Sequence, residues 1–149
     1  MHIVADETRC SGCRACEVAC VARHDGRFGT ATARVRVAKI EARGTDHPRL
    51  CRQCADAPCV EACPAGALHV DLVTGAIGLD RDLCLICPAC ADACPFGVVH
   101  VDPATGLPLI CDLCGGDPAC LKRCVTGALS RADAASRHGT AHPPEADGV

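Results

Sequence analysis

The chain has 149 residues, of which 16 are Cys, two are Phe and none is Trp or Tyr. Its formal net charge of −3 excludes a strongly basic nucleic-acid binder, and no apolar run approaches the roughly 18 residues of a membrane span. Residues 1–7 lack the basic region and apolar run of a signal peptide. We therefore expect a cytoplasmic protein, where thiols stay reduced and dense Cys indicates metal binding.

The first cysteine motif and the strand after it occupy the N-terminal third. The motif reads Cys10-x2-Cys13-x2-Cys16-x3-Cys20. A loop is predicted over residues 21–31, and residues 32–40 alternate apolar and basic side chains, which is typical of a half-exposed strand. Arg34, Arg36 and Lys39 are expected to form a solvated edge of that strand.

Two further motifs in the middle of the chain belong to an internal repeat. They read Cys51-x2-Cys54-x4-Cys59-x3-Cys63-Pro64 and Cys84-x2-Cys87-x2-Cys90-x3-Cys94-Pro95. Both continue as Cys-Pro-x-Gly-x-x-His-Val-Asp and then Thr-Gly, with matched positions 31 residues apart. Pro64 and Pro95 predict the end of a short helix that carries the fourth Cys, and Gly66 and Gly97 suit a tight turn. A β-hairpin is predicted after each motif.

The fourth motif completes the set. It reads Cys111-x2-Cys114-x5-Cys120-x3-Cys124. A third copy of the repeat begins after Cys124 and carries Gly127. Residues 131–149 are polar and are predicted to be a tail that is disordered alone or bound to a partner.

The spacing within each motif suits iron–sulfur clusters. A Cys-x2-Cys-x2-Cys loop turns three thiolates toward one cluster, and its backbone N–H groups face the cluster sulfides. In the bacterial ferredoxin run the fourth Cys, three residues later, ligates the other cluster of a pair. With so few aromatic side chains, clusters would also supply the bulk that the small Ala, Val and Leu residues need to pack against. Folding and cluster binding are then expected to be one event.

The same residues fit other kinds of site less well. Structural zinc sites need paired Cys-x2-Cys units, or such a unit with His, but not the third Cys and the x3-Cys that follow here. His69 and His100 occupy equivalent repeat positions and are predicted to make hairpin hydrogen bonds rather than to ligate iron. No catalytic triad, phosphate-binding loop or dinucleotide fingerprint is present, so no catalytic residue is predicted. A structural zinc protein is the remote alternative.

The charge is uneven along the chain. Residues 1–52 hold ten Lys or Arg and six Asp or Glu, whereas residues 53–149 hold five and twelve. Each oxidised cluster with four thiolates would add about two negative charges. The basic N-terminal part is therefore expected to balance cluster charge rather than to dock an acidic partner.

The four quartets resemble the four-[4Fe–4S] polyferredoxin family. Its members are the electron-transfer iron–sulfur subunits of dimethyl sulfoxide reductase, formate dehydrogenase and polysulfide reductase complexes, and of hydrogenases, carbon monoxide dehydrogenases and tungsten aldehyde oxidoreductases. The resemblance implies an α+β fold of two nested ferredoxin-like dicluster units. The outer unit would combine residues 1–50 with 108–130, and the inner unit would span 51–107. In this sequence Val21 and Val125 stand where the family pattern has Pro after the fourth Cys.

The resemblance also implies which cysteines share a cluster. All sixteen would be iron ligands of four [4Fe–4S] clusters. The outer clusters would take Cys10, Cys13, Cys16 and Cys124, and Cys111, Cys114, Cys120 and Cys20. The inner clusters would take Cys51, Cys54, Cys59 and Cys94, and Cys84, Cys87, Cys90 and Cys63.

The expected function is that of a wire for single electrons. The chain would not be catalytic alone but would serve the catalytic subunit of a molybdenum or tungsten oxidoreductase, with aldehyde or formate as the favoured substrate. Further expected partners are a flavin- or NAD-binding subunit, a ferredoxin, or further copies of the chain in a longer wire. The alternatives are a free polyferredoxin or one that serves a hydrogenase or carbon monoxide dehydrogenase.

Overall fold

A computed structural model describes residues 1–132, so most of the predicted tail lies outside the described residues. The elements are short. The α-helices are α1 (Ala15–Asp25), α2 (Pro58–Glu61), α3 (Ala89–Asp92) and α4 (Ala119–Arg123), with 3-10 turns η1 (Glu7–Arg9), η2 (Glu41–Arg43) and η3 (Leu113–Gly116). The strands are β1 (His2–Ala5), β2 (Arg36–Ile40), β3 (Thr45–Arg49), β4 (Leu68–Val70), β5 (Ile77–Leu79), β6 (His100–Val101), β7 (Pro108–Leu109) and β8 (Leu129–Ala132).

The strands form four separate antiparallel pairs: β1 with β8, β2 with β3, β4 with β5, and β6 with β7. Three of these pairs are local hairpins. The fourth joins distant parts of the sequence, with Ile3 opposite Arg131 and Ala5 opposite Leu129. Small antiparallel sheets mixed with short helices agree with the predicted α+β class.

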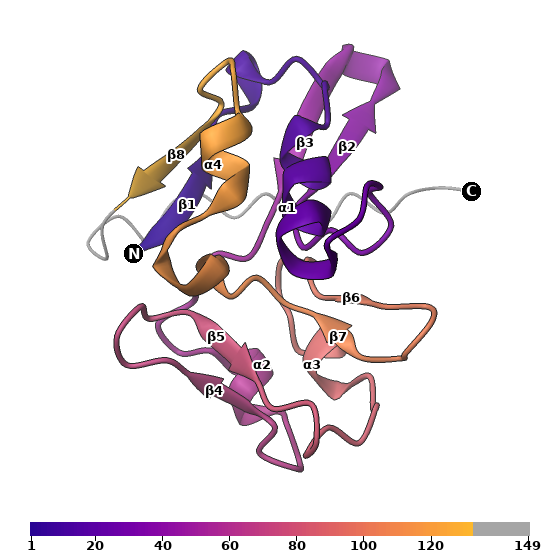
Figure 1. Cartoon of the computed structure of the whole chain (residues 1–149), viewed down its shortest axis with the longest axis vertical. Coiled ribbons are helices and arrows are strands. Elements are labelled where there is room, and N and C mark those ends of the chain that lie inside the picture. Colours follow the sequence, from indigo (N-terminus) through magenta and orange to yellow (C-terminus); the bar gives the residue numbers. More distant parts are fainter. Residues whose placement is uncertain (133–149) are drawn as a thin grey trace.

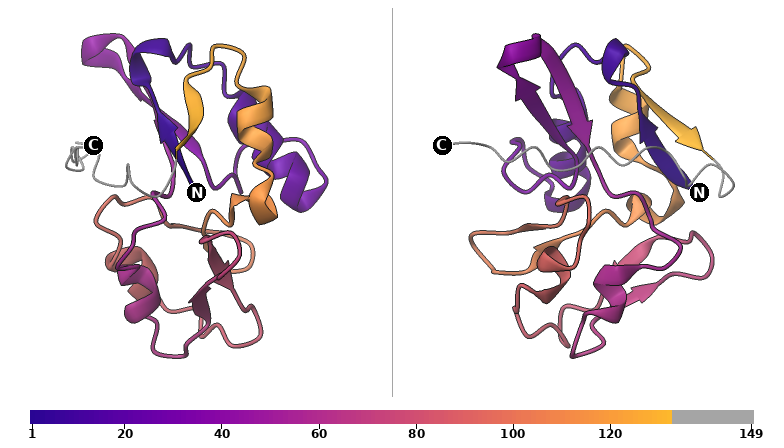
Figure 2. Two further views of the ribbon diagram at one scale, coloured as in Figure 1. Left: turned by 90° about the vertical axis from the view of Figure 1, so that its left-hand side faces the viewer. Right: turned by 180° about the vertical axis from the view of Figure 1, so that it is seen from behind.

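The molecule has two halves (Figures 1 and 2). One half contains β1, α1, β2 and β3 from the start of the chain together with α4 and β8 from the end of the described residues. The other half contains α2, β4, β5, α3, β6 and β7 from the middle. Helix α1 packs on α4 in the first half, and α2 packs on α3 in the second. We call these the outer and inner halves.

Each half has its own hydrophobic core. The outer core includes Ile3, Cys16, Cys20, Val21, Val35, Leu113, Cys120 and Leu129. The inner core includes Cys59, Leu68, Ile77, Cys90, Val99 and Ile110. Cysteine is thus part of both cores. Because β7 pairs with β6, the inner hairpin extends past the expected boundary at residue 107.

Helix α1 corrects the loop that was predicted from residue 21. It continues to Asp25, and the backbone N–H of Gly26 donates to the carbonyl oxygen of Ala22 where the helix ends in the left-handed conformation. Val21 is buried in the outer core at 1% exposure. A Pro at that position would have removed a helical hydrogen bond, so its replacement by Val lets the helix run on.

The repeat is organised largely as predicted. Helices α2 and α3 end at Glu61 and Asp92, so they carry the third Cys of each motif and not the fourth, which corrects the prediction. Gly66 and Gly97 have φ of +61° and +56°, as expected for the turns. The hairpins β4–β5 and β6–β7 are confirmed.

The third copy of the repeat departs from this plan. Its strand β8 pairs with β1 rather than with a strand of its own. Strand β8 also includes residues 131 and 132, the first two of the predicted tail.

The predicted strand at 32–40 begins only at Arg36 and pairs with β3. Lys39 is exposed as expected, but Arg34 and Arg36 are half-buried, so they do not belong to a solvated edge. The reason is that this part of the outer half adjoins the inner hairpin. The positive charges of Arg36 and Arg49 act on His100 of β6, which requires the two halves to be close there.

Two polar contacts fasten the halves together. The side chain of Gln53 is buried at 1% exposure and bonds to the backbone at Cys111 and at Ile77. Arg49 donates from Nη2 to the carbonyl oxygen of Phe96 at 3.0 Å. Among residues 1–132, no helix has the length and apolar character needed to cross a membrane.

Candidate iron–sulfur sites

One cavity gathers the four cysteines of a predicted outer cluster. Its lining includes Cys20, Cys111, Cys114 and Cys120. Cys20 comes from α1, Cys114 from η3 and Cys120 from α4, with Cys111 just before η3. The other lining side chains are mostly apolar and include Ile3, Val35, Leu50, Leu113 and Pro118. Four sulfur atoms from distant sequence positions therefore converge on an apolar space, as a Cys₄-ligated cluster requires.

Burial favours the protonated form of the thiols of Cys111, Cys114 and Cys120 by raising their pKa values. It raises the pKa of Cys120 to about 12, with the neighbouring charges of Cys20 and Cys114 adding to the effect. Burial likewise raises the pKa of Cys111 well above its ordinary value. Since a thiolate is the ligand form, iron must displace these protons, and the free energy of cluster binding must exceed the cost of removing them.

Cysteines of the second and third motifs lie close to one another. Burial raises the pKa of Cys51 to about 12, and the charges of Cys59, Cys54 and Cys94 raise it further. Cys94, the last cysteine of the third motif, thus lies with the first three cysteines of the second.

The reciprocal contact is present as well. The pKa of Cys90 is raised, first by burial and also by the charges of Cys87 and Cys63. Cys63, the last cysteine of the second motif, thus lies with cysteines of the third. Cysteines from both middle motifs also share the inner core.

The first motif contains both buried and exposed cysteines. Burial raises the pKa of Cys16 to about 11, with smaller contributions from Glu17 and Cys10, whereas Cys13 is exposed. Cys10 and Cys124 both pack against the outer core. These contacts place Cys10, Cys16 and Cys124, three of the four cysteines of this predicted site, in the outer half.

Backbone N–H groups approach several sulfur atoms. Arg34 donates to Cys20 Sγ at 3.3 Å and Leu129 donates to Cys124 Sγ at 3.4 Å. The pKa of Cys63 is lowered: burial raises it, but several backbone N–H groups led by Leu68 and Ala67 outweigh burial. Such hydrogen bonds stabilise a thiolate and tune the potential of the cluster that it holds.

The cysteine loops contain unusual backbone conformations. Arg14, Gln53, Ile86 and Cys114 have φ between +51° and +57° although none is glycine. A left-handed residue inside a short loop turns successive N–H groups toward a common centre and creates a place for negative charge. Sequence reasoning missed these positions, because non-glycine residues give no signal for this conformation.

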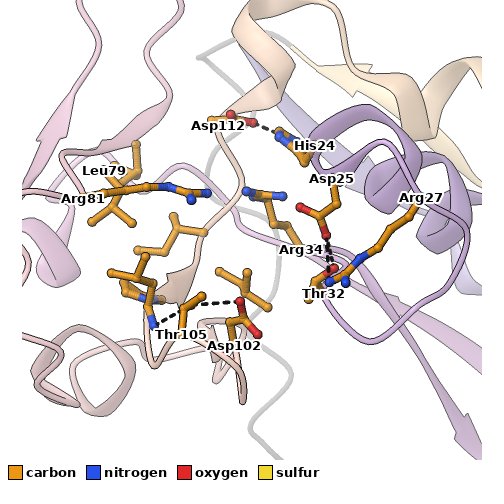
Figure 3. Close-up of a pocket in the computed structure, with 15 residues that line it drawn as sticks. His24, Asp25, Arg27, Thr32, Arg34, Leu79, Arg81, Asp102, Thr105 and Asp112 are labelled. Atoms are coloured by element: carbon orange, nitrogen blue, oxygen red, sulfur yellow. Dashed lines mark hydrogen bonds and ion pairs between the residues drawn. The ribbon is translucent and has the colours of Figure 1, made fainter.

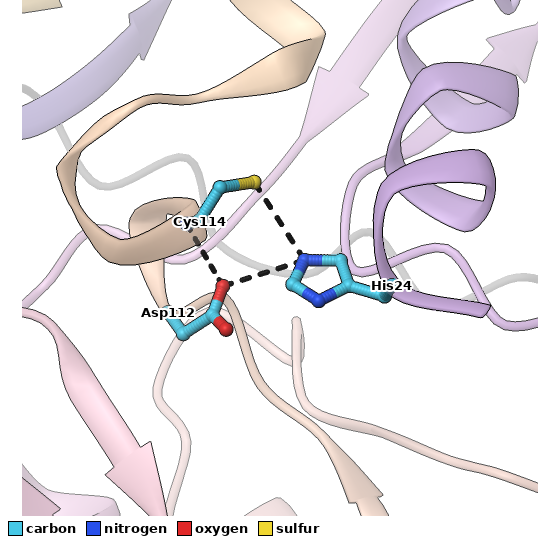
Figure 4. Close-up of side chains that lie close together, drawn as sticks. All are labelled: His24, Asp112 and Cys114. Carbon is cyan, nitrogen blue, oxygen red and sulfur yellow. Dashed lines mark hydrogen bonds and ion pairs between the residues drawn. The ribbon is translucent and has the colours of Figure 1, made fainter. Parts of the chain in front are cut away.

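His24 is a further residue at the outer site that sequence reasoning missed (Figure 4). Its Nε2 lies 3.6 Å from Cys114 Sγ and 3.4 Å from Asp112 Oδ1. Burial lowers the pKa of His24, and the nearby Arg34 lowers it further. His24 stands one helical turn after Cys20 and so shares its face of α1. The four-residue spacing between Cys20 and His24 could have indicated this contact from the sequence. It does so only if the helix is expected to continue beyond Cys20.

Comparison with known proteins identifies the family of the chain. The model of the 4Fe-4S dicluster domain family matches residues 44–134. This chain belongs to that family. The matched segment contains the second, third and fourth motifs, and it supports [4Fe–4S] clusters as the type of cofactor.

Characterised relatives are redox proteins. The polyferredoxin-like subunit of an aliphatic sulfonate oxidoreductase from Pyrococcus furiosus is 43% identical over 122 residues, which are 82% of this chain and 70% of that protein. The electron transport protein HydN of Escherichia coli is 35% identical over 85% of each chain. The beta subunit of NADH-dependent phenylglyoxylate dehydrogenase from Aromatoleum evansii is 40% identical over 85% of this chain and 29% of its own length.

A solved structure shares the fold. A chain of the active site complex BamBC of benzoyl-coenzyme A reductase superposes with a TM-score of 0.51 and 31% identity, covering 86% of this chain and 76% of its own. Together with the relatives, this confirms the prediction of an iron–sulfur electron-transfer component that is not catalytic by itself.

Proposed function

We propose that this protein carries single electrons through four [4Fe–4S] clusters held in two nested pairs. The carrying observation is the crossing of cysteines between motifs. Cys20 lines a cavity together with cysteines of the fourth motif. The charge of Cys94 raises the pKa of Cys51 in the second motif, and the charge of Cys63 raises the pKa of Cys90 in the third. These are the exchanges that the nested pairing requires, and they support all sixteen cysteines as ligands.

The same contacts suggest an order for the clusters. The charge of Cys16 raises the pKa of Cys120, which supports placing the cluster of the first motif next to that of the fourth. The charge of Cys51 raises the pKa of Cys111, which supports placing the cluster of the fourth motif next to that of the second, in the inner half. We therefore place the cluster of the first motif at one end, those of the fourth and second motifs in the middle, and that of the third motif at the other end. Each cluster would pass one electron to the next.

The proposed partner is a class of enzyme subunit. We infer that the chain delivers electrons to or from the catalytic subunit of an oxidoreductase, with molybdenum or tungsten chemistry and aldehyde or formate as the substrate inferred from the sequence. The relatives support such a subunit role, but they serve different substrates. We also propose a flavin- or NAD-binding subunit or a ferredoxin as a further partner, and a cytoplasmic location for the protein.

Cysteine substitutions test the nested pairing. About sixteen iron atoms per chain are expected in protein prepared without oxygen. Cys94→Ser should perturb the cluster of the second motif, and Cys63→Ser that of the third, as followed by electron paramagnetic resonance of the reduced protein. If each substitution perturbs the cluster of its own motif, the crossed pairing is wrong.

Affinity purification from the native source tests the subunit role. A catalytic subunit that co-purifies in equal amount, and whose metal is then measured, would support the proposal and identify the reaction. A chain that is recovered alone and fully loaded with clusters would instead be a free carrier.

A further inference from the structure

A second cavity, of about 420 Å³, lies apart from the cysteines at the junction of the two halves. Its lining combines residues of α1 and the segment after it with residues of β5, β7 and the loops beside them. The volume falls in the range of small-molecule sites, roughly 300–1,000 Å³. The lining is largely charged or hydroxylated, and it includes Arg27, Arg34, Arg81, Asp25, Asp102 and Asp112.

The acidic groups of this lining already have partners. Asp25 accepts from the hydroxyl of Thr32 and pairs with Arg27. Asp112 accepts from the backbone N–H of Cys114 at 2.9 Å and lies beside His24.

Asp102 is held in the same manner within its own turn. It accepts from the backbone N–H of Ala104 and from Thr105 Oγ1 at 2.9 Å. Each of these three acidic groups therefore accepts at least one hydrogen bond from within the protein.

Two arginines are in the opposite situation. Figure 3 shows the guanidinium groups of Arg34 and Arg81 pointing toward each other across the cavity from opposite halves. Neither side chain has an ion pair within 4.0 Å among residues 1–132. The Nη1 of Arg34 is buried and has no hydrogen-bond partner there. A buried charged donor without an acceptor is costly, and two facing cations repel each other. An anion between them would relieve both costs.

We propose that this cavity binds a small polar molecule through a phosphate or carboxylate group held between Arg34 and Arg81. The planar guanidinium fork suits either oxyanion, because it can donate two parallel hydrogen bonds. The hydroxyls of Thr32 and Thr105 and the half-buried His24 line the same space. This site uses no cluster ligand, although Arg34 and His24 also line the cavity that holds Cys20 and Cys114.

Titration calorimetry on the cluster-loaded protein tests the site, with inorganic phosphate and succinate as the two probes and sodium chloride at equal ionic strength as the reference. We expect saturable binding of at least one probe, with one site per chain. The probe that binds more tightly identifies the oxyanion. Binding should weaken at least tenfold in Arg81→Gln, whose exposed side chain makes a folding defect less of a concern, and also in Arg34→Gln.

Lys39→Gln is the matched control. It removes one positive charge from the exposed tip of β2, outside the cavity lining, and should bind the probe as the unaltered protein does. The proposal is overturned if neither probe gives saturable heat above the chloride reference. It is equally overturned if Arg81→Gln and Lys39→Gln bind alike.

Discussion

The side-chain amide of Gln53 donates from Nε2 to the carbonyl oxygen of Cys111 at 2.7 Å, while its Oε1 accepts from the backbone N–H of Ile77 at 3.0 Å. Gln53 itself lies in the second cysteine motif, and Cys111 begins the fourth. One buried side chain therefore fixes the inner half against the outer half at the place where electrons are proposed to cross between them.

Replacing Gln53 by Leu should loosen this junction. The change leaves a buried N–H and a buried carbonyl without partners, at a cost of about 1–3 kcal/mol each. Faster loss of the visible cluster absorbance on heating, and a weaker magnetic interaction between clusters in the reduced state, are the expected results. A variant with unaltered stability and unaltered magnetic coupling would show that the amide does not hold the junction.

Proline substitutions at the two positions where the family pattern lacks its Pro, Val21 and Val125, should differ in their effect on stability. Val21→Pro falls inside α1 and should destabilise the protein by about 3 kcal/mol or more, because it removes a helical hydrogen bond and clashes with the preceding turn. Val125→Pro is the control, since Val125 is 86% exposed and follows Cys124, whose backbone is extended, as a residue before Pro prefers. Chemical unfolding with cluster absorbance as the signal compares them, and equal losses would contradict the argument.

His24 should influence the cluster of the fourth motif. His24 Nε2 faces both Cys114 Sγ and Asp112. In the tautomer with a proton on Nε2 it donates to the sulfur, which favours the reduced, more negative cluster. His24→Leu should therefore shift one of the four reduction potentials to a more negative value in a redox titration, while His24→Gln, which keeps an N–H donor, should shift it less. Unchanged potentials in both variants would remove His24 from this role.

His100 should make the protein less stable in mild acid. Burial lowers its pKa below the ordinary 6.5, and Arg36 and Arg49 lower it further. The unfolded chain then takes up a proton more readily than the folded one, so stability is lost as pH falls from 6.5 through the lower folded pKa. The midpoint of thermal cluster loss, measured between pH 7.5 and 5.5, should fall less steeply in His100→Gln than in the unaltered protein.

His69→Gln is the control for that experiment. His69 occupies the equivalent place in the β4–β5 hairpin and is exposed. Its replacement should leave the pH dependence as it is. If His69→Gln flattens the curve as much as His100→Gln does, the effect does not come from the arginines at the junction.

Iron removal should unfold the chain rather than leave an empty scaffold. Buried cysteines belong to both cores, and only two aromatic residues are available to replace the lost bulk. After anaerobic chelation, far-ultraviolet circular dichroism and amide exchange should report loss of structure in both halves. Retention of protected amides in the strands would show that the protein chain alone sustains the fold.

Sequence reasoning anticipated what local spacing encodes. The cysteine motifs, the glycine turns at Gly66 and Gly97 and the two middle hairpins follow from residues within reach of one another along the chain. It did not anticipate the length of α1, the left-handed Gln53 or the burial of Arg34. These depend on contacts between segments far apart in sequence, where a general pattern such as alternating basic residues is overridden by packing.

The pairing of β1 with β8 has a consequence for biosynthesis. Strand β8 spans Leu129–Ala132, so β1 has no partner until residues 129–132 have left the ribosome. The two middle motifs can bind their clusters first. The thiols of the first motif stay unligated until the cysteines of the fourth motif have been translated. Maturation would then proceed from the centre outward, and oxygen exposure during synthesis would threaten the earliest cysteines most.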